Sequence, residues 1–319
     1  MKRLILAFMF TAGICMAAVS LEPRNNRMVK QMIAHAHQKH AIPKDWLASQ
    51  FESLSMNESC LNLMQKPFEA KPWMTYKKMM LSKKRINNGK QFISQYKNTF
   101  DLYESQYKIP SSVVAAIIGI ETSYGTNKGN FHALEALTTL ALYYTPRSQF
   151  FYDETISLLD YAYHNQLDLG SIKSSYAGAV GIPQFMPSNI KLYGRHHGAK
   201  GSLDIYDNHH DAIASVFNYL KKNGKWQPNQ PVMKKLTLNA KKQQEILKLM
   251  GSQRLFPATP EVEKTFNLRP VKHSWIIKLQ TADDQTTLYR VFPNFRSIMR
   301  YNNSIHYSSA VFALSQHLA

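Results

Sequence analysis

An apolar run that ends in a carboxylate constrains this chain more than any other feature of its sequence. Residues 111–120 read Ser-Ser-Val-Val-Ala-Ala-Ile-Ile-Gly-Ile, and Glu121 follows directly. Pro110 fixes the start of a helix, the two serines offer a cap for its first N–H groups, and Gly125 offers a left-handed stop. The run therefore predicts an apolar helix with Glu121 in its last turns.

The position of Glu121 favours a role in proton transfer. Apolar surroundings disfavour the charged form of a carboxyl group, and the negative end of the helix dipole acts in the same direction. Both effects are expected to raise the pKa of Glu121 toward the range of a general acid, which makes it a catalytic candidate. The alternative is a Glu at a helix end that points to water, as most helical carboxylates do.

The first residues predict export. Met1-Lys2-Arg3 and the apolar residues 4–18 have the basic and apolar regions of a secretory signal peptide. We expect cleavage near residue 20 and a location in the periplasm or cell envelope; an uncleaved or lipidated anchor is the alternative. Ile14 before Cys15 argues against the lipoprotein anchor, because that signal needs a small residue there. Cys60 then remains as the one thiol, which excludes an intramolecular disulfide.

The composition indicates a globular protein with anionic partners. The 319 residues are 44% hydrophobic, enough for one large domain or two closely packed ones. The net charge of +18 would suit nucleic acid, anionic lipid or acidic polymers of a bacterial envelope. The cations form scattered pairs and short runs such as Lys83-Lys84-Arg85, which we interpret as solvated faces without a nucleic-acid motif. Export further argues against nucleic acid and leaves anionic envelope polymers as possible partners.

Periodicity indicates helices first and a small sheet later. Apolar spacing predicts mostly helix from about 24 to 110, then helices at 133–142 and 211–220 around a glycine-rich loop at 174–188. Alternating patterns then predict a small antiparallel sheet. These patterns span 232–238, 273–279 and 286–292, with further helices at 241–250 and 308–319.

The glycine-rich loop is a second candidate for function. Gly178, Gly181 and Pro183 demand special backbone geometry, while Gln184 and Phe185 offer a polar group and an aromatic face. Such a loop can line a sugar-binding cleft. The alternative is a connection whose glycines only permit tight helix packing.

Three motifs in order carry a resemblance to a known family. They are Gly119-Ile-Glu-Thr-Ser-Tyr-Gly125, Gly178-Ala-Val-Gly-Ile-Pro-Gln-Phe-Met-Pro-Ser188 and Arg300-Tyr-Asn-Asn-Ser-Ile-His-Tyr307. Together with Lys71-Pro-Trp73 they resemble the membrane-bound lytic murein transglycosylase B family, and the similarity runs from about residue 27 to the last residue.

The resemblance implies an α+β fold that is mainly α, with a lysozyme-like helical core and a deep groove. With the signal peptide at 1–20 and the periodicity described above, we expect an N-terminal helical subdomain at 21–110, the catalytic core at 111–225, a small α/β subdomain with the antiparallel sheet at 226–295, and a C-terminal segment at 296–319 that returns to the core.

The resemblance also implies a substrate and its contacts. The substrate is the glycan of peptidoglycan, cut between N-acetylmuramic acid and N-acetylglucosamine, and Glu121 matches the single catalytic acid/base. The residues that match substrate-binding positions are Arg147, Ser175, Gln184, Tyr301, Asn302 and Tyr307. Pro146 stands where the family has a second arginine, which puts one contact to the peptide or lactyl carboxylate in doubt.

The implied mechanism needs one carboxyl group. Neutral Glu121 protonates the glycosidic oxygen, and then, as a carboxylate, takes the proton of the muramoyl C6 hydroxyl while that oxygen attacks the anomeric carbon. The product is a 1,6-anhydromuramoyl end. Two rivals stay open: a muramidase that uses water and a second carboxylate, and a non-catalytic protein that binds peptidoglycan through the same groove.

The residues argue against a metal and against further catalytic acids. The resemblance implies a calcium loop, but residues 194–207 place cationic or apolar groups where oxygen ligands should recur, so we reject calcium and expect no cofactor. We interpret the pairs His196-His197 and His209-His210 as solvated loop histidines rather than a transition-metal site. We likewise expect Glu135 to be paired structurally and Asp153-Glu154 to be solvated.

Overall fold

The structure is a computed structural model that describes residues 27–64, 72–199, 201–282 and 285–319. The predicted signal peptide at 1–20 and Lys71 lie outside the described residues. None of the helices in these ranges has the length and apolar character that crossing a bilayer requires. The fold is mainly helical with small antiparallel sheets, as predicted.

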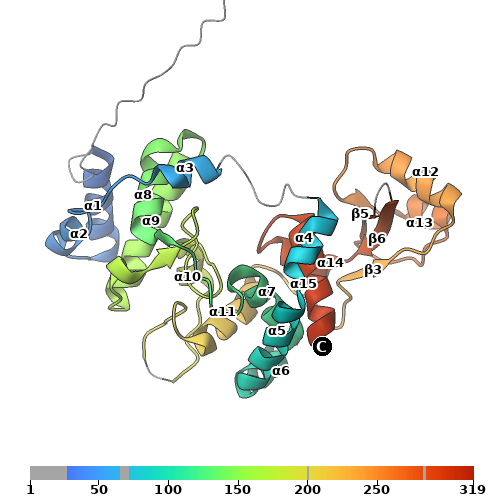
Figure 1. Cartoon of the computed structure of the whole chain (residues 1–319), viewed down its shortest axis with the longest axis horizontal. Coiled ribbons are helices and arrows are strands. Elements are labelled where there is room, and N and C mark those ends of the chain that lie inside the picture. Colours follow the sequence, from blue (N-terminus) through green and yellow to red (C-terminus); the bar gives the residue numbers. More distant parts are fainter. Residues whose placement is uncertain (1–26, 65–71, 200, 283–284) are drawn as a thin grey trace, which may run out of the picture.

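One hydrophobic cluster gathers the helices on the left of Figure 1. Its helices are α1 (Arg27–His40), α2 (Lys44–Gln50), α3 (Glu58–Met64), α8 (Ala133–Tyr143), α9 (Ser148–His164) and α10 (Pro187–Tyr193). Short elements connect them: strands β1 (Phe131–His132) and β2 (Lys173–Ser174) pair with each other, and 3-10 helices cover Thr145–Arg147 and Leu169–Ser171. The predicted helix at 133–142 is thus confirmed as α8.

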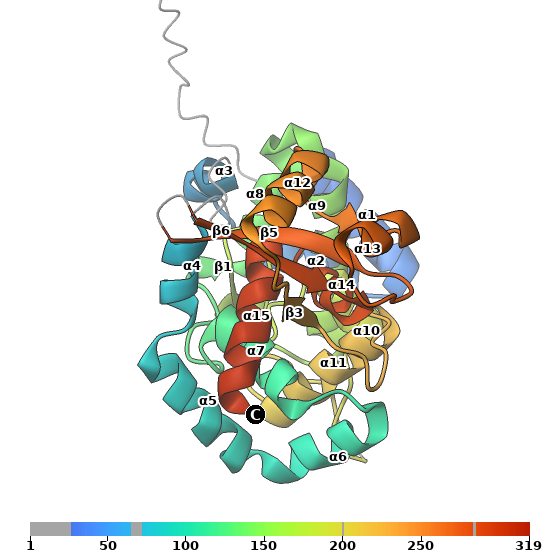
Figure 2. The same cartoon turned by 90° about the vertical axis from the view of Figure 1, so that its right-hand side faces the viewer.

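A second cluster surrounds the apolar run that opened the sequence. Its helices are α4 (Trp73–Met80), α5 (Lys83–Gln95), α6 (Lys97–Tyr107), α7 (Ser111–Thr122), α11 (His209–Lys222), α14 (Pro293–Met299) and α15 (Ile305–Leu318). Helix α15 lies alongside α7 (Figure 2). It begins at Ile305 rather than at 308, because Ser304 caps it by accepting a hydrogen bond from the N–H of Tyr307.

The third cluster lies between two helices and one face of a four-stranded antiparallel sheet. The strands run β3–β6–β5–β4 across the sheet. Alternation decides which side chains face which way: Ile276 and Leu288 meet the helices, whereas Ile277 and Val291 point into the second cluster. The elements are α12 (Ala240–Met250), α13 (Pro260–Phe266), β3 (Met233–Lys235), β4 (Phe256–Pro257), β5 (Trp275–Ala282) and β6 (Gln285–Val291).

The range 21–110 does not pack around one core. Helices α1–α3 contribute to the first cluster, and α4–α6 contribute to the second. Helix α3 lies on one side of the molecule and α4 on the other (Figure 1). The division of the chain into domains stays a prediction.

Candidate active site

Helix α7 brings Glu121 to the edge of the second core. Residues Val113 to Gly119 are buried, and Glu121 in the last turn is half-buried. Its carboxylate Oε1 accepts a 2.6 Å hydrogen bond from the hydroxyl of Tyr307 on α15. The carboxyl group therefore has a fixed orientation, which a solvated helix-end Glu would lack.

Two parallel tyrosines stand beside this carboxylate. The rings of Tyr301 and Tyr307 stack with centroids 6.5 Å apart and an interplanar angle of 11°. Burial, and after it the negative charge of Glu121, raises the pKa of both hydroxyls well above 10. Both hydroxyls are thus neutral donors at physiological pH.

The helix around Glu121 begins and ends differently from the prediction. No serine side chain caps α7; Pro110 occupies the cap position, and the N–H of Ser111 donates to Oε2 of Glu104 at 2.8 Å. The helix stops at Thr122, and the left-handed residues start with Ser123 (φ 50°) and Tyr124 (φ 64°), before Gly125. The predicted serine cap and glycine stop were therefore wrong.

Arg85 holds this strained turn in place. Its Nε donates to the carbonyl of Gly119 at 3.0 Å, and the hydroxyl of Tyr124 donates to the carbonyl of Arg85 at 3.0 Å. The two bonds tie α5 to the last turn of α7 in both directions. Burial lowers the pKa of Arg85, but not enough to neutralise a guanidinium at physiological pH. The prediction that the run 83–85 forms a solvated face is therefore wrong for Arg85, which is half-buried.

The glycine-rich loop is fastened to the motif of Glu121 and to the C-terminal segment. Thr122 Oγ1 donates to the carbonyl of Ile182 at 2.8 Å, and the hydroxyl of Tyr301 donates to the carbonyl of Pro183 at 2.5 Å. Tyr301 also packs against both the first and the second hydrophobic cluster. The three motifs that are far apart in the sequence therefore meet in one place.

Ser175 and Gln184 shape this loop from within. The hydroxyl of Ser175 accepts hydrogen bonds from the N–H groups of Ala177 (3.3 Å) and Ala179 (3.1 Å). Gln184, at a φ of 51°, donates through Nε2 to the carbonyls of Gly181 (3.0 Å) and Lys128 (3.2 Å). Both side chains fix backbone turns of the loop. This role could not be recognised from the residue types in the sequence.

Arg147 belongs to the other part of the molecule. It ends the 3-10 helix between α8 and α9, is exposed, and places its guanidinium 3.9 Å from the ring centroid of Phe150. Asn302 follows Tyr301 directly, and its carbonyl accepts a 2.7 Å hydrogen bond from the N–H of Ser304. Asn302 thus lies with Tyr301 and Tyr307, whereas Arg147 lies in the part that contains α8 and α9.

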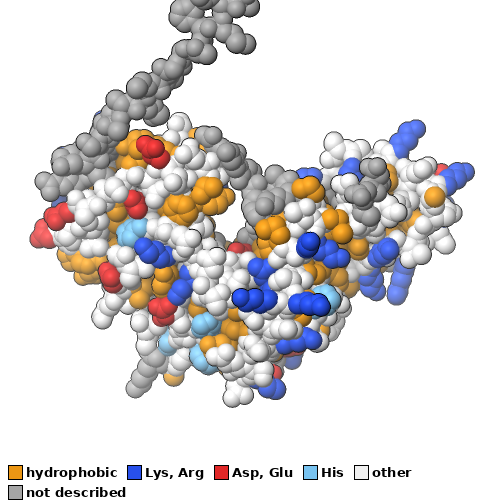
Figure 3. Space-filling model, viewed as in Figure 1, with side chains coloured by type: hydrophobic (Ala, Val, Ile, Leu, Met, Phe, Trp, Pro, Cys, Tyr) orange, Lys and Arg blue, Asp and Glu red, His pale blue; other side chains and the backbone are white. Residues whose placement is uncertain are grey.

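The molecule is hollowed between these two parts. Figure 3 shows the hollow between the side that carries α8 and α9 and the side that carries α4 and α15, and α7 lies below it in the view of Figure 1. A hollow of this kind between two parts of a molecule can accommodate a long polymer.

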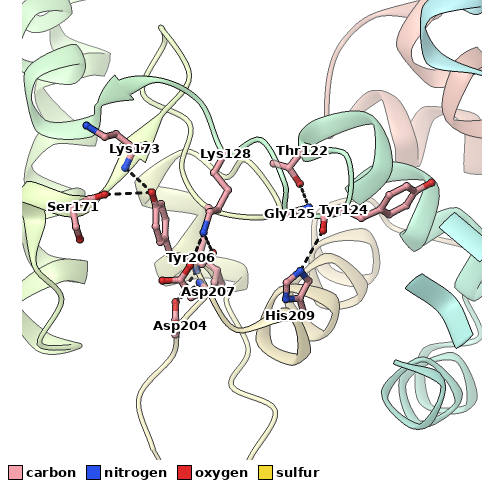
Figure 4. A network of polar contacts seen from close by, with 12 residues as sticks. Thr122, Tyr124, Gly125, Lys128, Ser171, Lys173, Asp204, Tyr206, Asp207 and His209 are labelled. Atoms are coloured by element: carbon pink, nitrogen blue, oxygen red, sulfur yellow. Dashed lines mark hydrogen bonds and ion pairs between the residues drawn. The ribbon is translucent and has the colours of Figure 1, made fainter. Parts of the chain in front are cut away.

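A polar network supports the turn after Glu121 from below (Figure 4). Nε2 of His209 hydrogen-bonds to the carbonyl of Tyr124 at 3.2 Å. Lys128 donates to the carbonyl of Tyr206 at 3.1 Å and pairs with Asp207. The position of the active-site turn thus depends on residues 204–209, which sequence reasoning had not connected with Glu121.

The loop at 194–207 is organised around a buried carboxylate. Asp211 Oδ1 accepts from the N–H of His197 (2.8 Å), and Oδ2 accepts from the N–H of Asp204 (2.9 Å) and pairs with Nδ1 of His196 (3.0 Å). Among the described residues, no group of three or more His, Cys, Asp and Glu side chains could hold a metal ion.

The histidines of this region are not free in solvent. His196, His197 and His209 are half-buried, and the rings of His197 and His210 stack with centroids 5.1 Å apart. The interpretation as solvated loop histidines was therefore wrong for those three.

Two other carboxylates had been assigned roles from the sequence. Glu135 accepts a 2.6 Å hydrogen bond from Ser55, as its structural reading predicted. Glu154 was expected in solvent, but its side chain is buried and accepts from both the N–H (2.8 Å) and the hydroxyl (2.7 Å) of Ser188. It holds the start of α10 against α9, and burial raises its pKa.

Comparison with known proteins agrees with the motifs. The family model of the transglycosylase SLT domain matches residues 24–316. Membrane-bound lytic murein transglycosylase B of Escherichia coli (strain K12) is 30% identical over an alignment 311 residues long, which covers 92% of this chain and 83% of the relative.

Solved structures share the fold over nearly the whole chain. The soluble lytic transglycosylase SltB1 from Pseudomonas aeruginosa has a TM-score of 0.81 at 29% identity and covers 91% of this chain and 98% of its own. The Escherichia coli lytic transglycosylase Slt35, in complex with calcium, also has a TM-score of 0.81, at 28% identity, covering 92% and 93%. The chain therefore belongs to the transglycosylase SLT domain family of enzymes.

Proposed function

We propose that this protein is a lytic transglycosylase that cleaves the β-1,4 bond between N-acetylmuramic acid and N-acetylglucosamine in peptidoglycan, with Glu121 as its single acid/base. The family supports the reaction class. The observation that carries the assignment to Glu121 is the 2.6 Å hydrogen bond that its carboxylate accepts from Tyr307.

The geometry suits a carboxyl group that changes charge twice in one cycle. Glu121 in its neutral form gives its proton to the glycosidic oxygen as positive charge develops at the anomeric carbon. The resulting carboxylate is stabilised by the hydroxyl of Tyr307, which is a neutral donor. The carboxylate then takes the proton of the C6 hydroxyl, whose oxygen closes the 1,6-anhydro ring and leaves Glu121 neutral again.

The remaining site residues are proposed to hold the glycan. Tyr301 and Tyr307 offer aromatic surface and hydroxyl groups beside Glu121, and Asn302 adjoins them. Ser175 and Gln184 fix the glycine-rich loop that faces them. Arg147 offers a cation on the side of the hollow that carries α8 and α9.

The proposed setting is the bacterial envelope. The basic n-region and apolar residues 4–18 support export by a cleaved signal peptide, and the +18 net charge supports attraction to anionic wall polymers. Peptidoglycan glycan strands are the proposed substrate, without a cofactor.

The test is mass spectrometry of soluble muropeptides released from purified sacculi by residues 21–319 and by its Glu121→Gln variant. We expect anhydromuramoyl ends from the unchanged enzyme and almost none from the variant, because the amide cannot exchange a proton. Binding of both proteins to sacculi, measured by co-sedimentation, is the control for folding and for the groove.

Other products would contradict the proposal. Reducing muramic acid ends would indicate a muramidase that uses water. Release by neither protein, with binding by both, would indicate a non-catalytic peptidoglycan-binding protein.

A further inference from the structure

Helix α4 has an outer face that the core does not use. Its inner side chains, Trp73 and Tyr76, are buried in the second hydrophobic cluster. The outer face carries Met74, Lys77 and Lys78, which are all exposed, and Met74 keeps 44% of its surface in solvent. An exposed methionine between lysines contributes little to the stability of this helix, so the face is available to a partner.

A pocket of about 470 Å³ lies on this outer face. The residues that line it are Met74, Thr75, Lys77, Lys78 and Leu81. Positions 74, 77, 78 and 81 recur at three- and four-residue spacing, so their side chains share one side of the helix. The methionine and the leucine offer apolar surface, and each lysine offers an aliphatic stem as well as a charge. We call these four residues the α4 stripe.

The surroundings of the α4 stripe are positively charged. Residues 72–100 contain seven Lys and Arg and no Asp or Glu. By contrast, residues 27–64 and 131–193, which supply most of the first hydrophobic cluster, contain 7 Lys and Arg against 8 Asp and Glu. Figure 3 shows Lys and Arg side chains intermixed with hydrophobic ones over α4 and α5. Positive charge is therefore concentrated on the part of the molecule that carries the stripe.

The lysines of this surface are not neutralised within the described ranges. The lysines that form ion pairs in these ranges are Lys97, Lys128 and Lys191. Four other lysines of α4 and the start of α5 are exposed and belong to none of these pairs: Lys77, Lys78, Lys83 and Lys84. Their charges can therefore attract an external anion without breaking an existing contact.

The α4 stripe has a rigid support. Nη1 of Arg85 donates to the carbonyl of Met79 at 2.6 Å, and its Nε donates to the carbonyl of Gly119 at 3.0 Å. Arg85 thus joins the end of α4 to α5 and α7. The two helices α4 and α5 follow each other along one edge of the molecule (Figure 2). An extended, flat partner can therefore contact both.

We propose that the α4 stripe and the start of α5 dock on a membrane that contains anionic phospholipids. The lysines pair with lipid phosphates, while Met74 and Leu81 enter the boundary between head groups and acyl chains. This combination of charge and apolar surface favours a bilayer over a soluble wall polymer, because the polymer offers anions without an apolar layer. Docking needs no reaction at Glu121, so the proposal does not depend on the proposed function.

The experiment is co-sedimentation of residues 21–319 with lipid vesicles, without the apolar leader that would bind lipid by itself. Vesicles of phosphatidylcholine and phosphatidylglycerol in equal parts are compared with vesicles of phosphatidylcholine alone. We expect binding to the mixed vesicles that weakens with added salt, and little binding to the neutral ones. These two lipid compositions separate recognition of anionic head groups from adsorption to any bilayer.

Two lysines test the charged part of the surface. Lys77→Gln with Lys78→Gln should weaken binding to the mixed vesicles about twentyfold, since each lysine near an anionic lipid surface strengthens binding about fivefold. The matched control is Lys241→Gln with Lys248→Gln, which removes the same charge from exposed positions of α12. The control should bind as the unchanged protein does.

Met74 tests the apolar part. Met74→Ser should weaken binding about fivefold, whereas Leu249→Ser, at a position of α12 that is 55% exposed, should not. A polarity-sensitive fluorophore attached in Met74→Cys should shift to shorter wavelength with the mixed vesicles, and the same label in Leu249→Cys should not. Cys60, the other thiol of residues 21–319, is buried.

Three outcomes would overturn the docking surface. The unchanged protein could fail to bind the mixed vesicles. The α12 controls could lose as much binding as the α4 variants, which would mean that net charge alone acts. A loss in the lysine variant without a loss or a spectral shift at Met74 would indicate a general polyanion site, such as one for wall polymers. Thermal unfolding confirms that each variant is folded, and unaltered cleavage of soluble glycan strands is expected for all of them.

Discussion

The hydroxyl of Tyr307 donates a 2.6 Å hydrogen bond to Oε1 of Glu121, across 186 positions of sequence. The ring that carries this hydroxyl is buried and lies parallel to that of Tyr301. The proposed catalytic group thus depends on α15 for its orientation as much as on α7 for its position.

Replacing Tyr307 with Phe removes this hydrogen bond and keeps the ring. We expect kcat to fall roughly tenfold to a hundredfold, since a hydrogen bond to a charged group contributes about 1.5–3 kcal/mol. Steady-state kinetics on soluble glycan strands measures the change, and thermal unfolding shows whether the core is preserved. Unaltered kcat in a folded variant would show that Glu121 needs no such partner.

Arg85→Met leaves the carbonyl of Gly119 without its guanidinium donor. We expect the free energy of unfolding to fall by about 1–3 kcal/mol, and kcat to fall in the protein that remains folded, because the turn after Glu121 loosens. Arg85→Lys should recover part of both. Lys84→Met, at an exposed neighbour in the same run, is the control; an equal effect there would contradict a role of Arg85 as a positioning residue.

We expect the folded protein to lose stability in acid because of His209. Burial, and after it the charge of Lys128, lowers the pKa of His209 below its ordinary value of 6.5. Below about pH 6.5, His209 is protonated in the unfolded chain but stays neutral in the folded protein. The free energy of unfolding therefore decreases as the pH falls toward the pKa of His209 in the folded protein. In His209→Gln, which keeps a donor for the carbonyl of Tyr124, the melting temperature should fall less between about pH 7 and pH 5.

Exposed His317 provides the comparison for this pH experiment. His317→Gln should reproduce the pH dependence of the unchanged protein. The same slope in His209→Gln and in the unchanged protein would mean that His209 is not responsible.

Calcium should leave the stability of this protein unaltered. The carboxylate oxygens of Asp211 already accept two backbone N–H groups and pair with His196, and Oδ1 of Asp204 accepts from the N–H groups of Tyr206 and Asp207. Differential scanning calorimetry should therefore give the same melting temperature in EDTA and in millimolar calcium, whereas Asp211→Asn should lower it. A rise of several degrees with calcium would contradict this expectation.

The features that could be predicted from the sequence are those that depend on contiguous stretches of residues. Periodicity located α8, α11, α12 and the alternating strands β5 and β6, and the motif resemblance located Glu121 together with Tyr301 and Tyr307. An apolar stretch and a family motif are both contiguous, so each can be recognised without knowing what lies against it.

The features that were missed depend on distant partners. Arg85 contacts Gly119 across 34 positions, Glu154 contacts Ser188 across 34, and His209 contacts Tyr124 across 85. Each of these side chains looked solvated, because a charged or polar residue is usually exposed when no partner is known. Only the folded structure shows which distant backbone or side-chain group each of these residues contacts.

The bond between Glu121 and Tyr307 also sets an order of events during synthesis. A ribosome adds about 5–20 residues per second, so Tyr307 follows Glu121 by on the order of ten to forty seconds over the 186 intervening positions. Throughout that interval Glu121 lacks the hydroxyl donor of Tyr307, and the glycine-rich loop lacks its hydrogen bond from Tyr301. In the proposed mechanism, the enzyme is therefore inactive until Tyr307 has been synthesised.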